Sequence, residues 1–198
     1  MENTEKYLHD ITEIRRVVSA SGRFLSLSGL SGILGGVWSL AGAWSVHRIL
    51  CMGVVGSEAV TAIAAIAAAV LALSLITGLV LTVRRARQMG ASLWTHSFRQ
   101  LCIQAAPPLL AGGLYIIIAV MREQYASVAA LCLLFYGLAL LSGARFSHKE
   151  LYYAGTAEVL LGLVAALFPA AGLPLWAAGF GIVHLIYGIV MYFRYERA

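Results

Sequence analysis

Residues 149–194 read KELYYAGTAEVLLGLVAALFPAAGLPLWAAGFGIVHLIYGIVMYFR, and this stretch carries the clearest signal of the fold. It contains two apolar segments, 151–168 and 173–193, separated by a short connector with a proline and a glycine. A helix needs about 20 consecutive apolar residues, within a range of about 17–25, to cross a bilayer. Both segments meet that length, so the stretch predicts a pair of membrane-spanning helices.

The rest of the chain has the same apolar character. Of its 198 residues, 61% are hydrophobic and only 12% are charged, whereas soluble domains contain about 45–50% apolar and about 25% charged residues. The composition predicts an all-α integral membrane protein, with an N-terminal segment at 1–23 and one membrane domain at 24–198. Six apolar runs are long enough to span the bilayer: 24–46, 59–83, 101–121, 126–144, 151–168 and 173–193.

The basic residues lie mainly on one side of these expected spans. All Lys and Arg residues except Arg48 and Arg122 fall in the N-terminal segment, in the connectors 84–99 and 145–149, or at the C-terminus. The positive-inside rule places these regions, and therefore both termini, in the cytoplasm. The net charge of +5 thus reflects membrane topology and does not indicate nucleic-acid binding. Because no cleavable signal peptide is recognisable, the first span is expected to be an uncleaved anchor.

Two further helices are expected at the membrane surface. Residues 4–18 place their apolar side chains on one helical face, which predicts an amphipathic helix that packs under the bundle, lies on the membrane or docks a cytoplasmic protein. Trp94 and Phe98 in the basic connector suit a short interfacial helix. Pro107 and Pro108 then either break the third span, as at some transport sites, or mark where the interfacial helix ends and the span begins. We favour the second interpretation.

The even-numbered spans share a short motif. A glycine lies among apolar residues at Gly78, Gly137 and Gly188, with an arginine shortly after it in each case. We interpret the chain as three tandem helix hairpins, an internal repeat that could surround a pseudo-threefold axis.

Two ionisable residues lie in the apolar middle of the last two spans. Glu158 and His184 are at similar depth from the same side of the membrane, roughly 13 and 15 Å by the helical rise. Ionisable groups at such depth often mark ligand or proton pathways. Tyr187 lies near the face of His184, and Tyr136 is an aromatic candidate on the fourth span. The expected site therefore comprises Glu158, His184, Tyr187 and Tyr136, and the alternative is a buried hydrogen bond that locks the hairpin.

A metal site would need more ligands than these spans supply. His184 and Glu158 provide two, and Cys132 or Tyr136 would have to complete the set, whereas zinc usually takes four ligands or three plus water. Haem ligation by His184 alone is a further option. We therefore predict no cofactor.

The first span contains the sequence GLSG at 29–32. This GxSG pattern resembles the nucleophile motif of rhomboid intramembrane proteases, and His184 followed by Gly188 resembles their catalytic histidine region. The resemblance implies a serine hydrolase with Ser31 as nucleophile, His184 as base and Glu158 as orienter. The rhomboid serine, however, lies on the fourth span, and Asn3, the only asparagine here, does not match the rhomboid oxyanion-hole asparagine. Packing of small residues at 28, 32 and 36 fits the motif better.

Three longer segments carry another resemblance. The strings EKYLHDITEIRRV, FLSLSGLSG and GFGIVHLIYGIVMYFRYE together resemble a family of small six-span bacterial inner-membrane proteins. The resemblance extends over the whole chain and implies a bacterial inner-membrane location. It implies no mechanism, because we know of no activity, ligand or catalytic residue for that family.

These observations favour a non-enzymatic membrane protein that binds or moves a small solute or a proton at the polar site of the last hairpin. An intramembrane serine hydrolase is the second hypothesis. The third is a regulatory or interaction subunit that docks a cytoplasmic protein through residues 4–18. The expected surroundings are the lipid bilayer, and the glycine-rich spans are compatible with a homo-oligomer.

Overall fold

The computed structural model describes residues 28–88 and 94–197, and every regular element within these ranges is a helix. Six helical segments are long and apolar enough to cross a membrane, as the composition predicts. The amphipathic helix expected at 4–18 lies outside the described residues. The first five spans are α2 (Gly29–Cys51), α3 (Gly56–Gln88), α4 (His96–Met121), α5 (Tyr125–Gly143) and α6 (Lys149–Leu167).

The last span is composite. It follows the short 3-10 turn η2 (Pro169–Ala171) and consists of α7 (Gly172–Trp176), the π-helical segment η3 (Ala177–Val183) and α8 (His184–Tyr195). A second 3-10 turn, η1 (Ala144–Phe146), connects α5 to α6.

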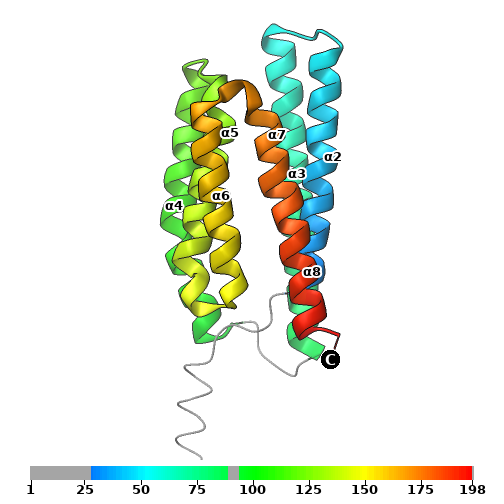
Figure 1. Ribbon diagram of the computed structural model, residues 1–198, viewed down its shortest axis with the longest axis vertical. Helices are drawn as coiled ribbons and strands as arrows, with labels where there is room; N and C mark the ends of the chain where they lie inside the picture. Colours follow the sequence, from blue (N-terminus) through cyan, green and yellow to red (C-terminus); the bar gives the residue numbers. More distant parts are fainter. Residues whose placement is uncertain (1–27, 89–93, 198) are drawn as a thin grey trace, which may run out of the picture.

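The last span joins two groups of helices. On one side α4 packs on α5 and α5 on α6, and on the other side α2 packs on α3. Within the last span, α7 contacts α5 and α6, η3 contacts α2 and α6, and α8 packs along α2. Figure 1 shows α4 to α6 on one side, α2 and α3 on the other, and the orange-to-red last span crossing from the first group to the second. Residues of the last span are thus placed between the two groups.

Glycines set the closest of these approaches. A Cβ atom on Gly188 of α8 would clash with backbone atoms of Gly29, Gly32 and Ile33 on α2. Gly36 meets the backbone of the last span in the same way, at the carbonyl of Gly181. The contact of helix backbones through small residues is typical of membrane helices. The packing role that the sequence indicates for Gly32 and Gly36 is therefore confirmed.

The three motif glycines have different surroundings. A Cβ on Gly78 would meet no atom within 4 Å, one on Gly137 would clash with the carbonyl of Gly155 on α6, and one on Gly188 would clash with α2. The last span also packs along α2, which belongs to the first hairpin. Three equivalent tandem hairpins are therefore not confirmed. The glycine-bearing face of α5 packs on α6, whereas that of α8 packs on α2.

The proline pair does not interrupt α4. Pro107 and Pro108 lie inside a continuous helix that begins at His96, so the interpretation that they separate an interfacial helix from the span is wrong. The helix begins earlier because the Thr95 hydroxyl caps it by accepting a hydrogen bond from the Phe98 amide at 3.2 Å. Trp94 lies just before this first turn, and a separate interfacial helix is not confirmed.

Candidate functional site

Glu158 lies on the face of α6 that meets the last span. Its side chain is fully buried, and neither carboxylate oxygen has a hydrogen-bond partner in the described part of the chain. The close approach to the last span depends on Gly179 of η3, because a Cβ at that position would clash with the carboxylate of Glu158 and with Leu133. A buried carboxylate without hydrogen bonds is costly, so its presence calls for an explanation.

His184 lies directly beside this carboxylate. Its Nδ1 atom is 3.3 Å from Glu158 Oε1 and 3.2 Å from the carbonyl oxygen of Gly179. Its Nε2 atom is 2.8 Å from the Tyr136 hydroxyl. In the neutral tautomer that suits these contacts, Nδ1–H donates to Gly179 and Nε2 accepts from Tyr136. The structure therefore brings Glu158, His184 and Tyr136 together, from three different spans.

The π-helical segment immediately before His184 shapes this arrangement. Short π-helical segments within α-helices are rare and occur frequently at functional sites. Here the segment ends at Val183, so its last turn sets the direction of the His184 ring. Phe180 within it is stacked on that ring, with centroids 5.8 Å apart, and its ring centroid is 4.9 Å from that of Tyr136. The imidazole is thus held by an aromatic neighbour as well as by hydrogen bonds.

Tyr187, the remaining residue of the expected site, is not hydrogen-bonded to the other three. Its hydroxyl is buried and has no hydrogen-bond partner among the described residues. The ring itself lies beside Gly32 of α2. Tyr187 is therefore a neighbour of the site and not a member of the hydrogen-bonded group.

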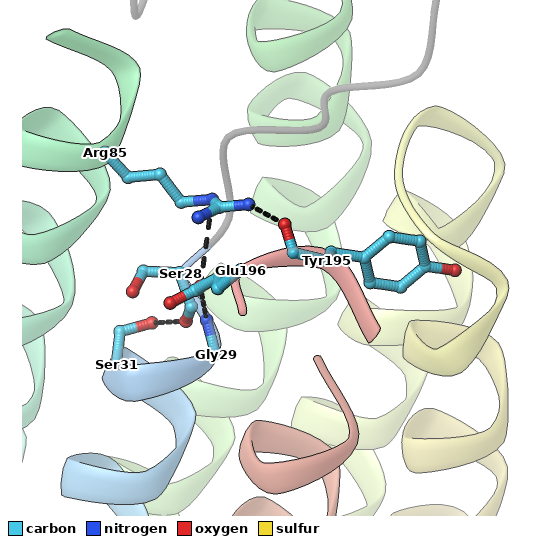
Figure 2. Close-up of polar contacts among 6 residues, drawn as sticks. All are labelled: Ser28, Gly29, Ser31, Arg85, Tyr195 and Glu196. Atoms are coloured by element: carbon cyan, nitrogen blue, oxygen red, sulfur yellow. Dashed lines mark hydrogen bonds and ion pairs between the residues drawn. The ribbon is translucent and has the colours of Figure 1, made fainter. Parts of the chain in front are cut away.

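Ser31 is engaged elsewhere. Its hydroxyl donates to the carbonyl oxygen of Ser28 at 2.5 Å, at the start of α2 (Figure 2). Both ring nitrogens of His184 have other partners, namely Tyr136 on one side and Gly179 with Glu158 on the other. The hydrogen bonds of the described residues therefore do not form the serine–histidine pair that a hydrolase would use.

Cys132 does not join a metal-binding group. It is a free, half-buried thiol on α5, one helical turn from Tyr136. Within residues 28–88 and 94–197, no three or more His, Cys, Asp and Glu side chains are close enough together to hold a metal ion. The set His184, Glu158 and Cys132 considered from the sequence is therefore not assembled, because Tyr136 occupies the position beside His184 Nε2.

A second polar group lies at the end of the bundle where α3 ends and α6 begins, which we call the basic end. Glu196 accepts a hydrogen bond from the Gly29 amide at the start of α2, and its Oε1 is 3.7 Å from Arg85 Nε of α3. Arg85 also donates to the carbonyl oxygen of Tyr195 (Figure 2). Ser28 provides no side-chain cap for α2, so the carboxylate of Glu196 caps this helix from the other end of the chain.

The same C-terminal residues also reach the group formed by α4, α5 and α6, through α6. Glu150 of α6 accepts hydrogen bonds from Arg194 Nη1 at 3.0 Å and from the Tyr195 hydroxyl at 3.2 Å. We call the group of Gly29, Arg85, Glu150, Arg194, Tyr195 and Glu196 the C-terminal clamp. It connects α2, α3 and α6 at the basic end. The sequence gives no signal for it, since Glu196 and Glu150 look like ordinary charged flanks of apolar runs.

We expect replacement of Glu196 by Gln to loosen the C-terminal clamp. The change removes the ion pair with Arg85 and weakens the cap of α2, so the free energy of unfolding should fall by about 1.5–3 kcal/mol, the usual contribution of a hydrogen bond to a charged group. Thermal unfolding in mild detergent measures this loss of stability as a lower unfolding midpoint. Glu58→Gln, the same chemical change at an exposed position of α3, should leave the midpoint unchanged. Equal midpoints for the two variants would contradict a stabilising clamp.

Comparisons with protein-family models, curated proteins and solved structures found no match to this chain.

Proposed function

We propose that this chain is a non-enzymatic integral membrane protein that holds and moves a proton at the site formed by Glu158, His184 and Tyr136. The observation that carries the proposal is the fully buried, unsatisfied carboxylate of Glu158, 3.3 Å from a histidine nitrogen in the middle of the spans. The proposal includes the location expected from the sequence, a bacterial inner membrane with both termini in the cytoplasm.

A purely structural role explains this carboxylate poorly. Replacing buried ion pairs by apolar residues of similar volume is often neutral or stabilising, so a bundle that needed only packing would gain nothing from a carboxylate here. His184 already has partners in Tyr136 and Gly179 without Glu158. The carboxylate is therefore dispensable for satisfying the histidine, which favours a role in binding a proton.

The pair can exchange a proton without separating charge over a long distance. In the tautomer that suits the contacts of His184, Nδ1 carries the proton and Nε2 accepts from the Tyr136 hydroxyl. The Tyr136 O–H bond breaks and gives its proton to Nε2 while the tyrosine oxygen takes up a second proton, which leaves an imidazolium beside the Glu158 carboxylate. The Nδ1–H bond of that imidazolium then breaks, its proton passes to a Glu158 oxygen, and the carboxyl O–H later releases it. One proton enters and one leaves, and histidine acts as the shuttle.

Tyr187 extends the site toward the basic end. Its buried hydroxyl, which has no hydrogen-bond partner among the described residues, lies about one helical turn beyond His184. His184, Tyr187 and Tyr195 are separated by three and eight residues along the last span, close to one helical face. These residues support a route for protons between Glu158 and the C-terminal clamp.

The tight packing favours a proton over a larger solute. Leu133, like Glu158, has no exposed surface, and even one methyl group on Gly179 would clash with both side chains. The serine hydrolase is not part of the proposal, because the hydrogen bonds of His184 lie with other groups. A regulatory role through residues 4–18 falls outside the described residues and stays a prediction from the sequence.

Proton flux through reconstituted protein tests the proposal. Liposomes with a pH-sensitive dye inside and a potassium gradient clamped by valinomycin should acidify faster with the wild-type protein than without it. Glu158→Gln and His184→Ala should each reduce this flux at least tenfold, because each removes a group that must bind the proton in turn. The infrared difference spectrum between acidic and alkaline pH should also show a carboxylic acid C=O band that is missing in Glu158→Gln.

Glu58→Gln serves as the matched control, since it makes the same change on an exposed part of α3, and it should keep full flux. If the Glu158 and His184 variants lower only the unfolding midpoint while the wild-type protein conducts no more than empty liposomes, the pair is a structural lock and the proposal fails.

A further inference from the structure

Three arginines near the end of α3 have different surroundings. Arg85 belongs to the C-terminal clamp, in which it contacts Glu196 and donates to the Tyr195 carbonyl oxygen (Figure 2). Arg84 and Arg87 are exposed, and neither forms an ion pair within the described part of the chain. Among the described residues, the guanidinium groups of Arg84 and Arg87 therefore have no counter-charge at the basic end.

Both arginines border one hollow on the outer surface of α3. This open hollow of about 610 Å³ is lined by three apolar side chains followed, toward the helix end, by three that can donate hydrogen bonds. The lining residues are Leu79, Val80, Val83, Arg84, Arg87 and Gln88. Residues 80, 83, 84 and 87 share one helical face by their i, i+3, i+4 and i+7 spacing.

Along α3 the apolar residues come before the cationic ones, which matches the arrangement of acyl chain and headgroup phosphate in a phospholipid. The apolar part lies on the membrane-spanning section of α3, where Leu79 and Val80 are 58% and 57% exposed. The cationic part follows within two turns, in the last residues of the helix. An acyl chain can therefore contact the apolar wall while the headgroup phosphate lies between the arginines.

We propose that this hollow binds an anionic phospholipid, with Arg84 and Arg87 holding the phosphate and the Gln88 amide donating to the phosphate or to a headgroup hydroxyl. Guanidinium groups suit this task because they donate paired hydrogen bonds to phosphate oxygens and are always charged. Each basic side chain near an anionic membrane surface also adds to the attraction of anionic lipid. Two arginines in one site therefore select an anionic lipid over a zwitterionic one.

Membrane topology explains why basic residues lie at the basic end, but it does not require them to form a binding site. The feature that distinguishes a binding site is that both arginines and the apolar wall border the same hollow. The inference is independent of the proton site, because no lining residue belongs to the Glu158 group or to the C-terminal clamp.

Native mass spectrometry of the full chain in mild detergent tests the site. The protein is titrated with phosphatidylglycerol and, separately, with phosphatidylcholine of identical acyl chains. Wild-type protein should bind phosphatidylglycerol about tenfold more tightly than phosphatidylcholine. Arg84→Gln together with Arg87→Gln should remove most of this preference. Val80→Trp, which fills the hollow from its exposed wall and keeps both arginines, should weaken phosphatidylglycerol binding as well.

The matched control is Arg145→Gln together with Lys149→Gln. These residues are exposed at the same end of the bundle and lie outside the hollow, so the change in net charge is equal. This control should keep the preference for phosphatidylglycerol. Equal losses in the two double variants would show a diffuse charge effect, and unchanged binding in the Arg84 and Arg87 double variant would show that the hollow is not a lipid site. Either result overturns the proposal.

Discussion

Replacement of Gly188 by Ala should be among the most destabilising single substitutions in this protein. The added Cβ would clash with backbone atoms of Gly29, Gly32 and Ile33, and backbone cannot rotate away as a side chain can. Overpacking of this kind costs typically 1–3 kcal/mol and occasionally more, and here we expect about 3 kcal/mol. For a chain of this length that corresponds to a fall in Tm of roughly 6–12 °C. Thermal unfolding in mild detergent, followed by tryptophan fluorescence, measures the shift.

Gly35→Ala on α2 is the matched control. A Cβ at Gly35 would meet no atom within 4 Å, so this variant should unfold at the wild-type temperature or slightly above it, because alanine favours helix over glycine by about 0.5–1 kcal/mol. The difference between the two variants reports how closely α8 packs on α2. Equal midpoints for Gly188→Ala and Gly35→Ala would show that the two helices are further apart than the structure places them.

Replacement of Glu158 by Leu should separate function from stability. The leucine fills a similar volume, removes two unsatisfied buried oxygens and leaves His184 with Tyr136 and Gly179 as partners. The free energy of unfolding should therefore stay within about 1 kcal/mol of wild type or rise, because the neutral His184 keeps both its other partners and no uncompensated charge is left behind. Proton flux should fall at least tenfold, since leucine binds no proton. Both quantities are measured on the same reconstituted preparation.

Glu150→Leu provides the contrast on the same helix. It removes the acceptor for Arg194 and Tyr195 in the C-terminal clamp, so it should destabilise the protein although the chemical change is identical. A loss of more than about 3 kcal/mol in Glu158→Leu, the cost of breaking a buried pair that the fold relies on, would identify Glu158 as a structural residue and refute its role as a proton carrier.

The spans were predictable because each depends on local composition. Long apolar runs bounded by charged residues identify membrane helices whatever their neighbours are, and the structure has helices at all six predicted positions. Boundaries were less predictable. The sequence predicted a third span at 101–121 and a separate interfacial helix ending near Pro107, whereas α4 is one continuous helix that begins at His96 after the Thr95 cap. Prolines are tolerated within membrane helices where neighbouring groups satisfy the freed backbone.

The polar site was only partly predictable. Depth along the spans identified Glu158 and His184, since an ionisable residue in an apolar run stands out in any sequence. The π-helical turn that directs His184 was not predictable, because it depends on how the last span fits between α2 and α6. The small residues at Gly179 and Gly181, just before His184, were the available signal for close packing there.

Hydrophobicity and charge are enough to predict six apolar helices and the side on which most basic residues gather, because both properties act on each segment independently. Which helices touch depends on the tertiary structure. It placed α8 against α2, brought Tyr136 to His184 and joined both ends of the described chain in the C-terminal clamp. Pairing between helices depends on the shape of whole faces, chiefly where glycines let two backbones meet, and many pairings fit the same set of apolar segments.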